Sequence, residues 1–399
     1  MDSFIRAPAS VALVHDWLTG MRGGEKVLDA FCRRFPNAPL WTLLYNPGSV
    51  SSRIADRVIH KSFLQYCPLS ATKYRSYLPL FPLFAETNKA DAQIVISTSH
   101  AVAKSMVKRG DSGKQLHLCY MHTPMRYAWD LFDEYFGPQR VGAFASRMFY
   151  KPIMNLLQKY DLHTLNRVDV FIANSTFVAE RIQRIYGRDA EVLPPPVDVE
   201  RFAGTARKPE DWYLVVSALV PYKRVEHAIE ACARMNRRLK VVGSGPELKT
   251  LIQYANEKKA RVEFVGFVPD ETLADYFSRA KALLFPGIED FGIVPVESIA
   301  AGCPVVAFAQ GGILDSMTNE TCVFYFEQSA EGLISAICDF ESRRDAFSMQ
   351  QLRERASLFS ERAFLIGFES ILQRALASKG FTPDIGRGEP SSNLDGLPS

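Results

Sequence analysis

Two carboxylates flank a predicted turn and helix start in the segment GIEDFGIVPVES, residues 287–298. Glu289 and Glu297 are separated by seven residues, and Pro295 suits the first turn of a helix that would contain Glu297. The turn between the carboxylates is built from Phe291, Gly292 and Ile293. Backbone N–H groups at a helix start bind anions or hydroxyls, and the two carboxylates can accept hydrogen bonds from sugar hydroxyls. The segment therefore predicts a binding site.

A second motif, SALVPYKRVEHAIEA at residues 217–231, places Lys223 and Arg224 in a short loop between a predicted strand and a helix. Fixed positive charge beside a helix N-terminus suits a pyrophosphate. In residues 241–251, VVGSGPELKTL, Gly243 and Gly245 would let the backbone approach a ligand. The sequence contains no Asp-x-Asp and no His/Cys cluster with metal-ligand spacing. We therefore expect no metal and no other cofactor, so positive side chains would have to neutralise any pyrophosphate bound there.

Two motifs in the first half also follow predicted strands. In HDWLTGMRGGEKVLDAF, residues 15–31, Gly23 and Gly24 precede a helix, so a donor phosphate or an acceptor could approach the backbone. The segment YMHTPMRYAWD, residues 120–130, gathers polar and aromatic side chains, namely His122, Arg126, Tyr127 and Trp129. Because sugars stack on aromatic faces, the last three could shape an acceptor site.

The elements that position these motifs alternate between short apolar runs and helical stretches. We expect buried strands at 11–17, 94–99, 116–123, 170–175, 213–219, 239–245, 262–268, 281–287, 304–309 and 322–327. We expect helices at 24–34, 225–237, 246–259, 270–280, 295–301 and about 349–377. This alternation predicts an α/β fold of two Rossmann-like, doubly wound domains facing each other across a cleft. Ligands of such sheets bind beyond the carboxyl ends of the strands, where the motifs lie.

The domain boundary is predicted at LPPPVDVERF, residues 193–202, because three consecutive prolines interrupt the rhythm of strands and helices. The N-terminal domain would then span 1–192 and the C-terminal domain 193–359. A C-terminal helix at about 360–378 is expected to pack back on the first domain, and 380–399 to be a disordered tail.

The carboxylate motif belongs to a longer pattern. E-x-F-G-x-x-x-x-E from Glu289 to Glu297 is followed by A-x-G-x-P-V-V-A from Ala300 to Ala307 and by Gly311-Gly312. The combination resembles the retaining glycosyltransferases of family 4, which have the GT-B fold, over about residues 12–375. The resemblance implies transfer of a sugar from a nucleotide donor to an acceptor hydroxyl with retained anomeric configuration, by a covalent intermediate or by front-face attack.

The resemblance also implies roles for individual residues. Glu289 would approach the donor sugar, Glu297 would hold the ribose hydroxyls, and His122 would hydrogen-bond the donor sugar. Lys223 matches the family's lysine, but Ser217-Ala218 stand where a phosphate-binding arginine is expected, so Arg224 is the substitute. Catalysis would rest on His122, Glu289 and Lys223. Donor binding would add Gly23, Gly24, Arg224, Gly243, Gly245, Phe267, Val268, Phe291, Gly292, Ile293 and Glu297, with Phe267 and Val268 flanking the nucleobase.

Two sequence segments suggest the substrates. HTPMRYAWD and SALVPYKR look like bacterial mannosyltransferases of surface-polysaccharide assembly, so mannose from GDP-mannose is the first choice and a UDP-sugar the alternative. The acceptor would be a glycan or a lipid-linked glycan, with a polyprenyl-pyrophosphate carrier as the first choice.

Charge is divided unevenly along the chain. Residues 1–190 carry 24 Lys and Arg against 15 Asp and Glu, whereas residues 191–399 carry 23 against 29. Two basic, aromatic segments at 61–86 and 140–160 could lie on an anionic membrane, or their apolar residues could face the core. With no run of about 20 apolar residues, no signal peptide and scattered cysteines, we expect a cytoplasmic protein, peripheral on the inner face of the cytoplasmic membrane.

Three other classes of function fit the sequence less well. A nicotinamide dehydrogenase would need a G-x-G-x-x-G after a strand with an acidic residue about 20 positions later, and none occurs. A non-catalytic carbohydrate- or lipid-binding relative would have no need for intact Glu289, Glu297 and Lys223. Nucleic-acid binding would suit the basic half, but no corresponding motif is found.

Overall fold

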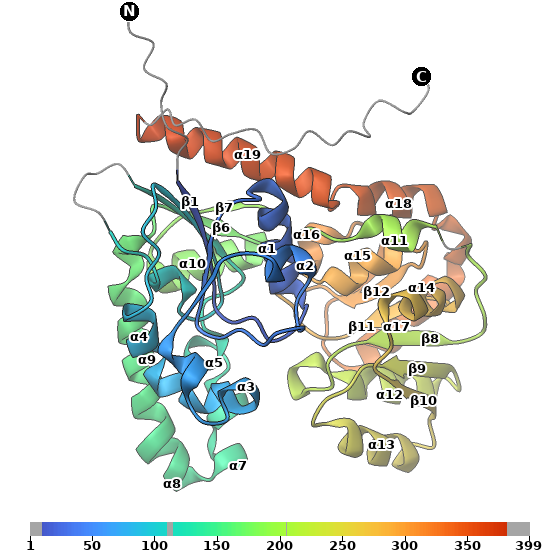
Figure 1. Cartoon of the computed structure of the whole chain (residues 1–399). Coiled ribbons are helices and arrows are strands. Elements are labelled where there is room, and N and C mark those ends of the chain that lie inside the picture. The colour runs from blue at the N-terminus through green and yellow to red at the C-terminus, as the bar shows by residue number, and fades with distance from the viewer. Residues whose placement is uncertain (1–9, 110–114, 205, 381–399) are drawn as a thin grey trace, which may run out of the picture. The chain divides into compact units, whose positions relative to one another are not determined.

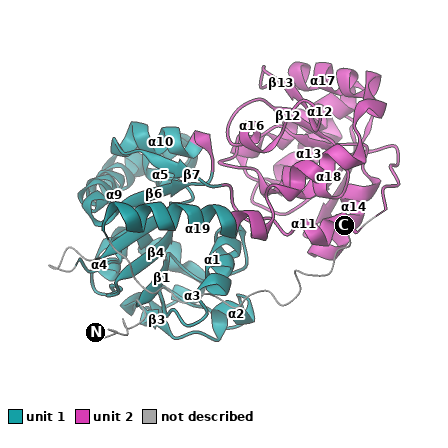
Figure 2. Ribbon diagram, turned by 90° about the horizontal axis from the view of Figure 1, so that it is seen from above, with its two compact units in different colours: residues 1–174, 178–193, 365–399 teal, residues 175–177, 194–364 magenta. Residues whose placement is uncertain are grey.

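The chain folds into two compact units, each of which is built on a parallel β-sheet. The computed structural model describes residues 10–109, 115–204 and 206–380. Unit 1 comprises residues 1–174, 178–193 and 365–399, and unit 2 comprises 175–177 and 194–364 (Figure 2). The two predicted Rossmann-like domains are confirmed. The tail expected at 380–399 lies outside the described residues, apart from Gly380.

The sheet of unit 1 has seven parallel strands in the order β3-β2-β1-β4-β5-β6-β7. Their bounds are β1 Val11–His15, β2 Leu40–Thr42, β3 Ile59–Lys61, β4 Ile94–Ser99, β5 Leu116–Met121, β6 Val170–Ala173 and β7 Ala190–Val192 (Figure 1). All the residues of β4 and β5 are buried, as expected for central strands covered on both faces. Strands β2, β3 and β7, which the sequence pattern did not predict, have three residues each and lie at or near the sheet edges.

Helices cover both faces of this sheet, because successive side chains of a strand point in opposite directions. In β5, Cys119 and Met121 pack against Val178 and Ile182 of α10 (Thr176–Tyr186). Tyr120 instead packs against Phe31 of α1 (Gly23–Arg34). The remaining helices are α2 Ser52–Ala55, α3 Ser70–Lys73, α4 Phe81–Glu86, α5 Arg126–Trp129, α6 Phe132–Phe136, α7 Pro138–Val141, α8 Ala143–Ala145 and α9 Lys151–His163.

The last helix, α19 (Glu361–Ser378), contributes its residues from 365 onward to unit 1. Phe368 lies edge-on to Phe31 with ring centroids 4.7 Å apart, and Glu369 pairs with Arg34 at 3.0 Å. The helices expected over about 349–377 are α18 (Met349–Ser357) and α19. Buried Phe359 lies between them, and its carbonyl accepts the Val197 N–H at 2.8 Å.

Unit 2 has six parallel strands in the order β10-β9-β8-β11-β12-β13. Their bounds are β8 Tyr213–Val216, β9 Arg238–Val242, β10 Arg261–Gly266, β11 Leu283–Phe285, β12 Val305–Phe308 and β13 Cys322–Tyr325. Leu214 of β8 belongs to a core with Phe277, whereas its neighbour Tyr213 belongs to another with Ile229. The helices are α11 Val199–Ala203, α12 Val225–Arg234, α13 Leu248–Glu257, α14 Asp270–Arg279, α15 Ile293–Ala300, α16 Ile313–Ser316, α17 Ala330–Ser342 and α18.

Both sheets have a point at which the strand order reverses. In unit 1 it lies between β1 and β4, and in unit 2 between β8 and β11. Connections from the two neighbouring strands leave toward opposite faces there, so a crevice opens beyond the carboxyl ends of the strands. Each unit therefore has one favoured position for a ligand site.

Within the part of the chain that the structure describes, none of the helices combines the length and apolar character needed to cross a bilayer.

Candidate active site

The reversal point of unit 2 brings together two of the predicted catalytic residues. Lys223 ends a 3₁₀ turn (Pro221–Lys223) that follows β8, and Glu289 follows β11. The Lys223 Nζ contacts Glu289 Oε1, and the two side chains are 9% and 26% exposed. Gly287 permits this approach, because a Cβ there would lie 2.9 Å from the Lys223 Cα. A buried cation and a partly exposed carboxylate thus meet where a ligand is expected.

The glycine pair Gly311-Gly312 fixes the backbone that carries Glu289. The N–H of Gly312 donates to the Glu289 carbonyl at 2.9 Å. Gly311 has a φ of 90°, and a Cβ on it would lie 2.5 Å from the same carbonyl oxygen. A side chain at either position would push the loop away, so the glycines hold Glu289 in place.

Glu297 lies in α15, as the sequence predicts, and its side chain is buried. Gly292 enters the helix with a φ of 91°, which favours glycine. Phe291 is buried against Phe359, with ring centroids 5.5 Å apart, so its side chain belongs to the core and only its backbone can serve a donor. Ile293 is partly buried against the same core.

Neighbouring backbone atoms of the protein leave no room for a side chain at Gly243 or Gly245. A Cβ on Gly243 would lie 1.9 Å from the Ser217 carbonyl oxygen, and one on Gly245 would lie 2.3 Å from that of Leu219. The loops after β8 and β9 therefore pack backbone to backbone, and the Leu219 N–H donates to the Ser244 carbonyl at 3.0 Å. This packing positions the loop that carries Lys223.

The remaining predicted donor residues of unit 2 lie at or near the surface. Phe267 is 81% exposed, so its ring is free to stack and is not core packing, whereas Val268 packs partly against the core. Arg224 precedes α12 in the left-handed conformation with a φ of 52°. Its side chain is 41% exposed, and its guanidinium lies 3.8 Å from Glu226 Oε1.

In unit 1, α1 begins at Gly23, and Gly24 lies against His122. A Cβ on Gly24 would lie 3.4 Å from His122 Nε2 and 3.5 Å from His15 Cε1. Burial holds the pKa of His122 well below its ordinary value, so the ring is neutral. Its Nε2 has no hydrogen-bond partner among the described residues. A neutral ring with an open nitrogen suits a hydroxyl ligand.

The predicted acceptor residues Arg126, Tyr127 and Trp129 together form most of α5. The Trp129 indole N–H donates to Asp161 Oδ2 at 2.9 Å, and this hydrogen bond fixes the orientation of the ring. Burial raises the pKa of Tyr127 well above its ordinary value, and its hydroxyl has no hydrogen-bond partner in the described chain. The three side chains share one turn of helix.

Sequence reasoning missed three residues at the reversal point of unit 1. His15 ends β1, Asp16 follows it, and His100 directly follows β4. His15 Nδ1 lies 2.6 Å from Thr98 Oγ1, and His100 Nδ1 lies 3.1 Å from Asp16 Oδ2. The available signal was position: a histidine stands at or directly after each of three strands, β1, β4 and β5, which are neighbours in the sheet. No group of three or more His, Cys, Asp or Glu side chains in the described chain could hold a metal ion.

Two family models match successive parts of the chain. The model of Glycosyltransferase Family 4 matches residues 21–201, and that of Glycosyl transferases group 1 matches 197–358. The chain belongs to glycosyltransferase family 4. The family 4 match lies mostly over the sheet of unit 1, and the group 1 match over the sheet of unit 2, including Lys223, Glu289 and Glu297.

Curated relatives of this family 4 chain include mannosyltransferases. The GDP-mannose-dependent alpha-(1-6)-phosphatidylinositol monomannoside mannosyltransferase of Mycolicibacterium smegmatis is 33% identical over 186 residues, which cover 39% of this chain and 49% of the relative. The protein of the same name from Mycobacterium tuberculosis is 29% identical over 206 residues, covering 44% and 54%. The matches thus span about half the length of these relatives.

Solved structures share the two-domain Rossmann-like architecture of the GT-B class. The lipopolysaccharide outer core galactosyltransferase WaaB has a TM-score of 0.64 at 17% identity, covering 93% of this chain and 99% of that one. Anabaena Alr3699/HepE, in complex with UDP and glucose, has a TM-score of 0.64 at 15% identity, covering 92% and 99%. At these identities the likeness establishes the fold.

Proposed function

We propose that this family 4 glycosyltransferase moves mannose from GDP-mannose to a hydroxyl of a glycan or lipid-linked acceptor, with retained anomeric configuration, in polysaccharide biosynthesis. The observation that carries the proposal is the contact between Lys223 and Glu289 at the reversal point of unit 2. A cation beside the start of α12 suits the developing charge of a nucleoside diphosphate. A partly exposed carboxylate suits the hydroxyls of the sugar.

The choice of donor is supported by the two relatives named above, which are GDP-mannose-dependent mannosyltransferases. It is tested by isothermal titration calorimetry of the full chain with GDP-mannose, UDP-glucose and ADP-glucose. We expect GDP-mannose to bind with at least tenfold lower Kd than the other two. A preference for UDP-glucose would favour the alternative donor class, and binding of none of the three with no turnover would favour a non-catalytic binding protein.

We predict that Glu297→Ala weakens GDP-mannose binding more than Glu289→Ala does. Glu297 is buried in α15 and would accept hydrogen bonds from the ribose, whereas Glu289 is more exposed and already contacts Lys223. Loss of a hydrogen bond to a charged group costs about 1.5–3 kcal/mol, which is roughly a tenfold to hundredfold rise in Kd. Calorimetry measures both variants, and equal Kd values for wild type and Glu297→Ala would contradict the ribose assignment.

We further propose that unit 1 contacts an anionic membrane that carries a polyprenyl-pyrophosphate-linked acceptor. In the two basic, aromatic segments some large apolar side chains pack in the core, such as Tyr74, Phe81 and Phe84, whereas others are exposed. Examples are Phe63 at 68%, Tyr66 at 73%, Phe144 at 72% and Phe149 at 59% exposure. Figure 1 shows α3, α7 and α8 at the end of unit 1 away from α19. Exposed aromatic and basic side chains at one end suit the interfacial region of a bilayer.

We predict that replacing Lys73, Arg75, Arg147 and Lys151 by Ser releases the protein from anionic vesicles. All four residues are exposed, and each basic residue near an anionic surface contributes about 1 kcal/mol. Flotation with phosphatidylglycerol vesicles at low salt should show at least a tenfold loss of bound protein, with GDP-mannose binding unchanged.

The matched control replaces four exposed basic residues of unit 2 by Ser, namely Arg238, Lys249, Lys258 and Arg261. This variant should float like wild type. Failure of the wild type to bind such vesicles at low salt would contradict the membrane proposal, as would equal release by the control.

A further inference from the structure

Two arginines stand side by side at one edge of the unit 2 sheet. β10 is the edge strand and β9 lies beside it (Figure 1). Arg238 is the first residue of β9, Arg261 is the first residue of β10, and the two are register partners. Neighbouring strands lie about 4.8 Å apart and register partners point to the same face, so both exposed side chains leave the sheet together. Because like charges opposite each other on neighbouring strands repel, the pair destabilises this edge unless an anion lies beside it.

A carboxylate close to this pair already has another partner. Asp211 accepts from Lys281 at 2.5 Å. The pKa of Asp211 is lowered chiefly by this hydrogen bond, and Arg238 makes a smaller contribution in the same direction. Neither Arg238 nor Arg261 forms an ion pair with any of the residues that the structure describes. The two guanidinium groups therefore stay without a countercharge of their own.

An open hollow of about 260 Å³ lies beside the two arginines, which form part of its lining. Trp212, Lys240 and Glu263 also line it. The Lys240 Nζ pairs with Glu263 at 3.0 Å and lies 5.0 Å from the centroid of the Trp212 ring, so these two charges balance each other. The arginines are thus the excess charge of the hollow. Its volume is below the roughly 300–1,000 Å³ of pockets that take drug-sized ligands, so it suits a smaller molecule.

The hollow lies at the opposite end of the sheet from the proposed donor site. Arg238 and Arg261 begin their strands, whereas Lys223 and Glu289 follow the carboxyl ends of β8 and β11. β9 has five residues, so at about 3.3 Å per residue its two ends lie roughly 16 Å apart. All four side chains belong to unit 2. The hollow and the donor site are therefore separate places in one unit.

We propose that Arg238 and Arg261 bind the phosphate group of a small, soluble phosphate monoester. A phosphate monoester carries a charge of about −1.5 to −2 at pH 7, which balances two arginines better than a monoanion does. Planar guanidinium groups donate paired hydrogen bonds to phosphate oxygens. The remainder of the molecule occupies the hollow. This site goes beyond the proposed function and does not depend on the identity of the sugar donor.

The test is isothermal titration calorimetry of the full chain with glycerol 3-phosphate at low ionic strength. The double variant Arg238→Gln/Arg261→Gln should bind at least tenfold more weakly than wild type, because loss of one hydrogen bond to a charged group raises Kd about tenfold or more. Acetate, a monoanion, should bind at least tenfold more weakly than glycerol 3-phosphate. Binding to wild type should weaken below about pH 6, where the phosphate takes up a proton and loses one charge.

Two control variants separate this site from general charge effects and from the donor site. Lys249→Gln/Lys258→Gln removes two other exposed charges of unit 2 and should keep the wild-type Kd for glycerol 3-phosphate within threefold. Lys223→Ala should also keep this Kd, because Lys223 belongs to the proposed donor site. GDP-mannose is titrated separately, so a failure of the donor assignment and a failure of this inference are told apart.

Several results would overturn the inference. They are no binding of glycerol 3-phosphate to wild type at millimolar concentration, a Kd of the arginine double variant within threefold of wild type, and loss of binding in Lys223→Ala, which would place the phosphate in the donor site. Flotation with phosphatidylglycerol vesicles distinguishes a soluble phosphate from a lipid headgroup. The arginine double variant should float like wild type, and its release would assign Arg238 and Arg261 to the membrane instead.

Discussion

Replacing Lys223 by Ala should lower kcat of sugar transfer by about 10²–10³-fold, with a smaller effect on donor Kd. The leaving nucleoside diphosphate gains negative charge as the bond to the sugar breaks. Lys223 is 9% exposed and lies just before α12, so its charge acts in a site with little screening. Loss of one preorganised group that stabilises transition-state charge costs about 2.7–4 kcal/mol.

The assay should be run in EDTA, since we propose that positive side chains and not a metal neutralise the diphosphate. Arg224→Ala is the matched control, because Arg224 is adjacent but 41% exposed. As a substitute phosphate contact screened by solvent, it should contribute about 1 kcal/mol or less, a fewfold change. Two results would contradict the assignment: a kcat of Lys223→Ala within threefold of wild type, or a wild type that turns over only with added magnesium or manganese.

The long buried strands were predictable because their chemistry is local. The runs 94–99 and 322–327 begin with the apolar stretches 94–96 and 322–326, and the structure has strands Ile94–Ser99 and Cys322–Tyr325 there. The strands β2, β3 and β7 are too short to establish a periodicity. Their pairing is decided by neighbours distant in sequence, such as Leu13 beside Leu40 and Ala173 beside Val192.

The candidate site was predictable in its parts but not in its pairings. The motifs around Lys223 and Glu289 were evident, yet their contact joins residues that lie 66 positions apart. The glycines show the same limit. The sequence shows that Gly243 and Gly245 have no side chain. It does not show which atoms lie beside them, and only the folded loops place the carbonyls of Ser217 and Leu219 there. His100 was missed because a lone histidine gains meaning only from the Asp16 carboxylate beside it.

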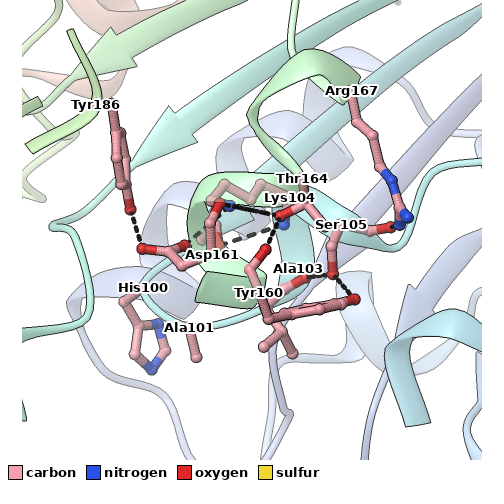
Figure 3. A network of polar contacts seen from close by, with 12 residues as sticks. His100, Ala101, Ala103, Lys104, Ser105, Tyr160, Asp161, Thr164, Arg167 and Tyr186 are labelled. Carbon is pink, nitrogen blue, oxygen red and sulfur yellow. Dashed lines mark hydrogen bonds and ion pairs between the residues drawn. The ribbon is translucent and has the colours of Figure 1, made fainter. Parts of the chain in front are cut away.

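Replacing Lys104 by Met should lower the free energy of unfolding of unit 1 by about 3–5 kcal/mol. The variant removes the cation from a pair in which both side chains are 1% exposed, and so leaves the Asp161 carboxylate buried without its countercharge (Figure 3). The Trp129 and Tyr186 donors to Asp161 remain, but neither carries a charge.

The matched control is Lys108→Met, since Lys108 pairs with Asp91 at 2.8 Å while both side chains are more than 60% exposed. Such surface pairs contribute about 0–1 kcal/mol. Urea unfolding, followed by tryptophan fluorescence, compares the two variants with wild type, because Trp129 reports directly on Asp161. Equal, small losses in both would mean that the buried pair stabilises the fold no more than a surface pair does.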